Sequence, residues 1–397
     1  MESRAQTIRL IEIASLSEAR TEMERVGVDP AGIKLMAPKE LYRNLKVTNL
    51  TAPAGNIIKQ DMIAVGGEAA VSKGVVSAEV DHTDCILSGT LKQFRRLIKK
   101  LSIQPYALKE TAKLIEGALN NLEVESYTLK GVNRSWDLGA SSNVRANTRA
   151  LVMGILNVTP DSFSDGGRYR SVEDAVSFGL EMVADGADII DVGGESTRPG
   201  SEGVSVEEEL KRVLPVIEGL VDGGAAISID TTKAEVARRA IKAGAEIVND
   251  VSAISMDEAM VEVVADTGAA VVLMHMRGTP KDMQAETDYE DLIGEVYGYL
   301  EERIEFALSK GIARDKIIVD PGIGFGKSAE ASLELIKRLG EFRTLGVPVM
   351  LGASRKSFMG KVAPETKARL MPSVAAAVAG VMNGASLLRV HDVRETR

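Results

Sequence analysis

The chain has 397 residues, more than a single hydrophobic core usually supports, so its length predicts two domains or one large barrel with an appendage. Hydrophobic residues make up 45% of the chain and charged residues 26%, a composition typical of a folded soluble protein, which excludes a disordered chain. The net charge of -9 argues against a nucleic-acid partner, because sequence-independent binding to phosphates needs clustered lysines and arginines.

The cysteine content and the N-terminus indicate the cytoplasm. Cys85 is the single cysteine, so the chain can form no internal disulfide and no cysteine-based metal cluster, which fits a reducing compartment. Residues 1–15 contain no apolar core of a secretion signal, and no run approaches the roughly 20 apolar residues of a membrane helix. We therefore expect a cytoplasmic protein with no membrane partner.

Residues 1–130 predict a small α+β domain whose role the sequence does not assign. They combine mixed apolar runs with a basic helix candidate at residues 90–123. The charge run KQFRRLIKK (92–100) is more typical of a solvated helix face than of a nucleic-acid patch. Residues 131–149 are rich in Gly, Ser and Asn and predict a linker, with an ordered edge around Trp136.

From residue 150 onward, short apolar runs alternate with longer amphipathic stretches. This alternation is typical of βα units that build a parallel sheet. The expected strands are residues 150–157, 187–194, 225–230, 245–250, 269–275, 316–322, 347–353 and 385–392. Eight such units within residues 150–397 predict a (β/α)8 TIM barrel, with a doubly wound open sheet as the alternative.

The last barrel unit is short. After Asp392 only the residues VRETR follow, too few for the helix that should cover the last strand. We expect a helix of the N-terminal region to cover this part of the barrel wall.

Polar residues stand at the end of every expected strand. In a parallel barrel the carboxyl ends of the strands meet at one face, where active sites form. A single Asp or Asn after a strand is more often a turn or helix-cap residue, but several of these lie within apolar runs and need buried partners. The set comprises Asn157, residues 195–198, Asp230, Asn249 with Asp250, His275, Asp320, residues 354–356, and Arg389 with His391. We therefore expect a polar ligand at this face.

Several common site types do not fit the sequence. The loop GIGFGKS (322–328) lacks the Walker spacing because Pro321 stands where the first glycine is required, and the dinucleotide spacing GxGxxG fails as well. Its glycines predict a tight turn whose backbone approaches a flat ligand. The three histidines lie too far apart in the chain for a zinc motif, and without a GxSxG motif we expect no covalent catalysis by serine.

Seven stretches of the barrel region closely resemble dihydropteroate synthases. In chain order they are MGILNVTPDSFSDGG (153–167), DIIDVGGESTRPGS (188–201), ISIDT (227–231), VLMHMRGTPKDMQ (272–284), DPGIGFGK (320–327), GASRKSF (352–358) and RVHDV (389–393). The resemblance covers residues 150–393 and implies a transferase of folate biosynthesis. Such an enzyme joins 6-hydroxymethyl-7,8-dihydropterin diphosphate to 4-aminobenzoate, giving 7,8-dihydropteroate and pyrophosphate. The N-terminal region resembles that of longer forms of the family.

The resemblance implies that the flat pterin ring binds at the carboxyl end of the barrel. Carboxylates and an amide would meet its donor edge, Lys356 would meet its acceptor side, and Arg389 would stack on its face. Met274 would pack against the other face or serve as a core residue. The positions that match the family at the donor edge are Asp230, Asn249 and Asp320.

The diphosphate leaves as an anion, so cationic and polar groups at the barrel mouth would stabilise its developing charge. The resemblance implies Asn157, Arg198, Arg389 and His391 for this task, and Lys356 completes the expected catalytic set. Mg2+ would bridge phosphate oxygens, with Asn157 as its protein ligand. If the diphosphate departs before the amine attacks, the pterin methylene becomes a cation stabilised by its own ring, and no enzyme nucleophile is required.

The 4-aminobenzoate would lie nearer the surface. The residues that the resemblance assigns to it are Phe163, Thr197, Arg198, Pro199, Phe325, Ser354 and Ser357. Ser357 or backbone donors would meet its carboxylate, and Phe163 with Arg198 would close over it and exclude water. The resemblance also implies a homodimer.

Three other functions remain open. A synthase that uses a ribosylated aminobenzene acceptor fits the same motifs. A methyltetrahydrofolate:corrinoid methyltransferase would share the deep acid and amide positions, but the long loops 157–167 and 196–201 suit a diphosphate better. A catalytically silent pterin-binding protein is disfavoured by the intact set Asn157, Arg198, Lys356, Arg389 and His391.

Overall fold

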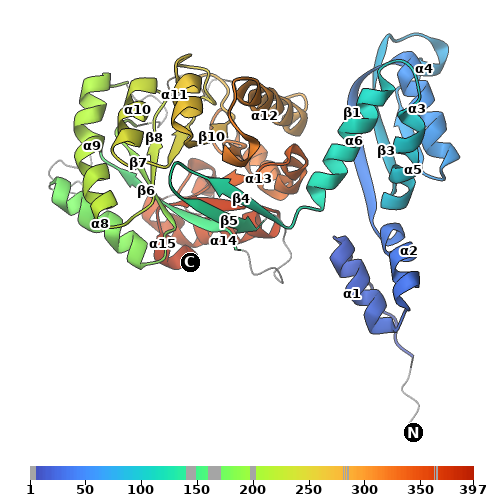
Figure 1. Cartoon of the computed structure of the whole chain (residues 1–397), viewed down its shortest axis with the longest axis horizontal. Helices are drawn as coiled ribbons and strands as arrows, with labels where there is room; N and C mark the ends of the chain where they lie inside the picture. Colours follow the sequence, from blue (N-terminus) through green and yellow to red (C-terminus); the bar gives the residue numbers. More distant parts are fainter. Residues whose placement is uncertain are drawn as a thin grey trace, which may run out of the picture. The chain divides into compact units, whose positions relative to one another are not determined.

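The computed structural model describes residues 6–139, 149–159, 171–196, 203–279, 281, 283, 286–361, 363 and 365–397. The chain forms two compact units, Met1–Glu123 and Val124–Arg397, coloured blue to teal and teal to red in Figure 1.

The first unit is an α+β domain, as predicted. Its antiparallel sheet has the order β1-β3-β2, built from Tyr42–Thr51, His82–Thr90 and Glu68–Val71. Its helices are α1 (Leu16–Val26), α2 (Pro30–Glu40), α3 (Ala52–Ala64), α4 (Gly74–Ser77), α5 (Leu91–Leu101) and α6 (Leu108–Leu122). The basic candidate at residues 90–123 is therefore two helices, because Tyr106 and Ala107 adopt positive φ angles of 57° and 60° after Pro105.

The second unit holds the predicted barrel. Its parallel strands are β6 (Leu151–Asn157), β7 (Ile189–Gly193), β8 (Ile227–Asp230), β9 (Ile247–Asp250), β10 (Ala270–Met274), β11 (Ile317–Asp320), β12 (Met350–Leu351) and β13 (Leu387–Val390). They pair in the order β11-β10-β9-β8-β7-β6-β13-β12. A parallel bridge between Val319 and Val349 joins the two outer strands and closes the ring. The closed barrel is confirmed over the open sheet.

Helices cover the barrel where amphipathic stretches predict them. They are α8 (Val172–Ala184), α9 (Val206–Asp222), α10 (Ala234–Lys242), α11 (Met260–Thr267), α12 (Leu292–Ser309), α13 (Ala329–Lys337), α14 (Leu370–Met382) and the short α15 (Val393–Thr396). Side chains of Ser171, Ser205 and Ser328 accept the amide hydrogen bonds that begin three of these helices. Val393 of α15 is buried in the main apolar cluster of the barrel. That an N-terminal helix covers the rest of this wall remains a prediction. No helix in the described ranges is both long and apolar enough to span a membrane.

A β-hairpin closes the amino-terminal end of the barrel. Its strands are β4 (Ser126–Lys130) and β5 (Ser135–Gly139), and the second lies within residues 131–149, where the sequence predicts a linker. Leu129 and Leu138 join the cluster of inward-facing residues at the beginnings of the barrel strands, and Trp136 packs against it. Glu246 Oε2 accepts the backbone amide of Asn133 at 2.7 Å and fixes the hairpin turn. The hairpin thus fills the amino-terminal end of the strand ring.

Candidate active site

Four polar side chains form one layer inside the barrel, near the carboxyl end of its strands. They come from the alternate strands β7, β9, β11 and β13 and are Asp191, Asn249, Asp320 and Arg389. The three residues other than Arg389 are only 0%, 2% and 3% exposed. Alternate strands of such barrels usually contribute branched apolar residues, as the layer below does here with Ile189, Ile247, Ile318 and Leu387. The polar layer therefore marks where the packed core ends.

Arg389 connects three strands through carboxylates. Its Nε donates to Asp191 Oδ2 and its Nη2 donates to Asp230 Oδ2 of β8, both at 2.6 Å. Asn249 Nδ2 donates to the same oxygen of Asp191 at 3.0 Å. Burial alone would lower the pKa of Arg389, but the two carboxylates raise it, so the guanidinium stays cationic. Two charge-assisted hydrogen bonds thus fix the position of this cation.

The deep carboxyl groups have shifted protonation equilibria. Burial raises the pKa of Asp230 to about 7, although the charge of Arg389 acts against this and that of Asp191 adds to it. Burial also raises the pKa of Asp320, whose Oδ1 accepts the amide of Gly322 at 2.7 Å. Carboxyl groups in this state suit a ligand edge that presents several N–H donors.

Lys356 reaches the layer from the loop that follows β12. Its Nζ donates to the carbonyl of Ile323 at 2.8 Å and lies 3.7 Å from the centre of the Phe325 ring. Burial lowers its pKa to about 7, with Asp320 acting in the opposite direction. The tight turn predicted for residues 322–328 is present. Gly322 has a φ of 68°, and a Cβ atom there would lie 1.9 Å from the carbonyl oxygen of His275.

Lys327 and His275 form a buried pair behind this turn. Lys327 Nζ lies 2.8 Å from His275 Nδ1. Burial lowers the pKa of Lys327 to about 7 and that of His275 to about 3. The imidazole is therefore neutral, and its Nδ1 is hydrogen-bonded to the lysine.

Three more of the expected site residues, Asn157, Ser354 and His391, lie at the mouth of the barrel. Ser354 Oγ accepts the backbone amide of His391 at 3.2 Å and lies 3.1 Å from His391 Nδ1. Asn157 ends β6 half-buried, and a Cβ on Gly193 of the adjacent strand would approach its Oδ1 to 3.3 Å. Because β6 and β13 are neighbours, Asn157 and His391 lie at the same part of the mouth.

The structure gathers most of the predicted site residues and leaves some outside the described ranges. Those in or beside the polar layer are Asp230, Asn249, Met274, Asp320, Phe325, Lys356 and Arg389. Ser357 is exposed and begins a short 3-10 helix, Ser357–Lys361. The residues that lie outside the described ranges are Phe163, Thr197, Arg198 and Pro199.

The sequence reasoning missed Asp191 and Lys327. Asp191 stands in the middle of the apolar run ADIIDVGG, and a charged residue within a strand buried on both faces is the signal that identifies it. Lys327 ends a glycine-rich turn, where a lysine is usually exposed. Its burial, at 3% exposure, is visible only in three dimensions.

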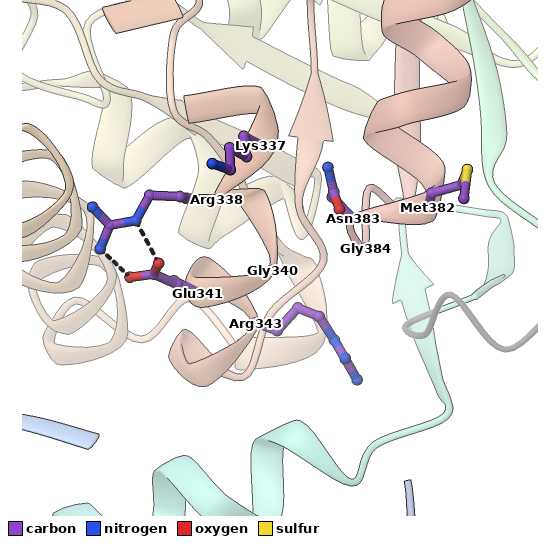
Figure 2. A pocket seen from close by; sticks show the side chains of 8 residues that line it. All are labelled: Lys337, Arg338, Gly340, Glu341, Arg343, Met382, Asn383 and Gly384. Atoms are coloured by element: carbon purple, nitrogen blue, oxygen red, sulfur yellow. Dashed lines mark hydrogen bonds and ion pairs between the residues drawn. The ribbon is translucent and has the colours of Figure 1, made fainter. Parts of the chain in front are cut away.

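A cavity of about 350 Å³ lies at the other end of the barrel (Figure 2). Its walls are the turns that lead from α13 toward β12 and from α14 to β13, so it opens on the amino-terminal face. Arg338 is already bound there by Glu341 at 2.6 Å and by Glu334 at 3.0 Å. The lining residues are Lys337, Arg338, Gly340, Glu341, Arg343, Met382, Asn383 and Gly384. In such barrels the amino-terminal face usually contributes to stability, and catalysis takes place at the opposite face.

Comparison with known proteins gives a consistent picture. Residues 153–391 match the family model described as pterin binding enzyme. The chain is 50% identical over 249 residues to dihydropteroate synthase of Escherichia coli, which covers 62% of this chain and 87% of that protein. A solved dihydropteroate synthase of Xanthomonas albilineans with 4-aminobenzoic acid superimposes with a TM-score of 0.62 at 45% identity, over 68% of this chain and 94% of that chain.

A longer relative matches the N-terminal unit as well. It is a probable bifunctional folylpolyglutamate synthase/dihydropteroate synthase of Halobacterium salinarum, 41% identical over 384 residues. The match covers 97% of this chain but 45% of the relative, so the chain spans about half the length of that protein.

Proposed function

The chain belongs to the pterin binding enzyme family, with a barrel of the dihydropteroate synthase type, and we propose that it forms 7,8-dihydropteroate and pyrophosphate from 6-hydroxymethyl-7,8-dihydropterin diphosphate and 4-aminobenzoate. The observation that carries the proposal is the polar layer at the carboxyl end of the barrel. Together with Asp230 of the neighbouring strand β8, this layer offers the carboxyl groups of Asp230 and Asp320, the amide of Asn249 and the fixed guanidinium of Arg389 to one flat ligand.

The pterin would lie on this layer. Asp230, Asn249 and Asp320 would accept hydrogen bonds from the N–H groups along one edge of the ring. Buried hydrogen bonds of this kind give specificity, because a ring without those N–H groups would leave the protein's polar groups unpaired. Lys356 would donate to the ring's acceptor side. The carboxylates hold Nε and Nη2 of Arg389, which leaves Nη1 and the flat guanidinium face for the ligand.

The reaction depends on departure of the charged diphosphate, and it requires no nucleophile from the enzyme because the aromatic amine of the second substrate attacks. The bond between the pterin methylene and the diphosphate oxygen breaks with its electron pair on the oxygen. The aromatic amine then bonds to the methylene carbon and releases a proton to solvent. Asn157, Arg198, Arg389 and His391 would bind the diphosphate oxygens, and preorganised donors stabilise this developing charge without reorganisation.

Mg2+ would bind at this site as part of the diphosphate substrate. Asn157, at the end of β6, would supply one amide oxygen, and no group of three His, Cys, Asp or Glu side chains is assembled for a metal among the described residues. Few protein ligands together with water and phosphate oxygens are the usual donor set of Mg2+. The ion would neutralise charge on the leaving group.

The 4-aminobenzoate would bind above the pterin. Phe325 lies beside Lys356 and would contact the aminobenzoate ring, and Ser354 is at the mouth. We also propose that this substrate contacts the other residues predicted for it, which are Phe163, Thr197, Arg198, Pro199 and Ser357. We further propose a cytoplasmic homodimer that binds small-molecule substrates and neither nucleic acid nor membrane.

The acceptor experiment tests the proposed function. The full chain is incubated with the pterin diphosphate and Mg2+, and with either 4-aminobenzoate or a ribosylated aminobenzene. Pyrophosphate release and product mass are measured. We expect the mass of 7,8-dihydropteroate with the first acceptor. Condensation with only the second acceptor would support the alternative synthase. In a separate incubation with methyltetrahydrofolate and a corrinoid, methyl transfer by a chain that catalyses no condensation would support the methyltransferase.

A further inference from the structure

We propose that Lys327 is a positioning residue that holds the turn of residues 322–327 in the shape on which Lys356 and Phe325 depend. This inference rests on the proposed function, because Lys356 and Phe325 are its substrate-binding residues. Lys327 itself lies behind the turn, and nothing in the proposal requires it to touch a substrate.

Lys327 Nζ is buried among three neutral acceptors. Its Nζ donates to the carbonyl of Phe325 at 3.0 Å and to that of His275 at 3.3 Å, and it faces His275 Nδ1 at 2.8 Å. When protonated, this side chain has three N–H donors, one for each of these acceptors. The lysine therefore ties the turn after β11 to the end of β10.

Two groups of the turn that Lys327 holds in place contact Lys356. The carbonyl of Ile323 accepts from Lys356 Nζ at 2.8 Å, and the Phe325 ring lies under the same nitrogen. Phe325 N donates to Gly322 O at 3.1 Å, so residues 322–325 move as one turn. A shift of the Phe325 carbonyl would thus displace both supports of Lys356.

An apolar residue at position 327 could not keep this arrangement. It would leave the carbonyl oxygens of His275 and Phe325 buried without their lysine donor, and a buried unpaired acceptor is costly. The turn would relieve that cost by rotating its peptide groups toward water. The substitution would then displace Lys356 and Phe325, and it would remove no direct contact between position 327 and a substrate.

The test compares Lys327→Met with Lys316→Met in the full chain. Lys316 is a matched control because its Nζ also donates to two backbone carbonyls, Gly268 and Gly131, the second at 3.3 Å, but at the amino end of the barrel. Both variants should lower Tm. We expect Lys327→Met alone to raise KM for both substrates about tenfold, the effect of losing roughly 1.4 kcal/mol of binding.

A double-mutant cycle identifies the route of the effect. In a Phe325→Leu background, Lys327→Met should raise KM for 4-aminobenzoate less than in the wild type, because the ring that it positions is already gone. If Lys327→Met does not fold, Lys327→Gln keeps a donor at this position and should give a smaller rise in the same direction. Unchanged KM values in the folded variant, or strict additivity in the cycle, overturn the inference. An inactive wild type would instead contradict the proposed function.

Discussion

Arg389 and Asp191 stand 198 positions apart in the chain and are joined in the barrel by a 2.6 Å hydrogen bond from Nε to Oδ2. The same aspartate oxygen accepts from Asn249, so one buried carboxylate orients two residues proposed to bind the pterin. Neither contact involves a substrate. Asp191 thus fixes the geometry of the proposed site from within the barrel.

Asp191→Asn should weaken the proposed reaction and alter its pH dependence. The substitution removes a negative charge beside Asp230, and a negative neighbour raises a carboxyl pKa. The ionisation of Asp230, with a pKa of about 7, should therefore move to lower pH. We expect kcat/KM to fall about a hundredfold because the guanidinium loses one anchor. The measurement is the pH profile of kcat/KM.

Asp188→Asn is the control for that change. Asp188 also binds an arginine, Arg149, with contacts of 2.7 Å and 2.6 Å, but at the start of the strands. It should leave the pH profile in place. An unshifted profile in Asp191→Asn would show that this carboxylate does not act on Asp230.

The burial of Lys356 predicts a pH-dependent stability. Its pKa falls from 10.5 in the unfolded reference to about 7 in the fold. Between these values the unfolded chain holds a proton that the folded chain has released, so stability from this group rises as pH increases from 7 toward 10.5. The Tm of the wild type, relative to Lys356→Met, should rise over this range. Parallel Tm profiles of the two proteins would contradict the prediction.

Gly322→Ala should disrupt the turn through two effects. Its φ of 68° disfavours a side chain, and the added Cβ would lie 1.9 Å from the carbonyl oxygen of His275. We expect a loss of stability above the ~1 kcal/mol typical of strained φ alone, with loss of pterin binding. Thermal unfolding and pterin titration measure the two effects.

Gly311→Ala separates strain from collision. Gly311 has a φ of 89°, with no atom within 4 Å of an added Cβ. This variant should show only the φ penalty and bind pterin normally. Equal losses in both variants would mean that the approach to His275 is unimportant.

Leu129→Ala should show that the hairpin β4–β5 is part of the barrel. Leu129 is 0% exposed and packs among the inward-facing strand residues. Its truncation should cost about 2–5 kcal/mol of unfolding free energy while leaving KM unchanged. Leu333→Ala, at a site 57% exposed on α13, should have little effect on either measurement. If Leu129→Ala has the same free energy of unfolding as the wild type, the hairpin does not stabilise the barrel.

The sequence by itself determined the alternation of strands and helices and the residues at the strand ends. Both are local properties, because an apolar run bounded by polar turns predicts a buried strand whatever it pairs with. Asp230, Asn249 and Asp320 could be identified in this way, and the motif order led to the family. Of the hairpin, only an ordered edge around Trp136 could be predicted, because five-residue strands, the second of them in a Gly- and Ser-rich stretch, carry too little periodicity.

Only the tertiary structure decided what those residues do to one another. Closing the ring brings Arg389 beside Asp191 and Asp230, and buries Lys327 against His275. Hydrogen bonds between such distant positions, and the pKa values of Asp230, Lys327 and Lys356, depend on burial and on the distances between charges. Those quantities arise from strand register across the barrel, which no local pattern in the chain encodes.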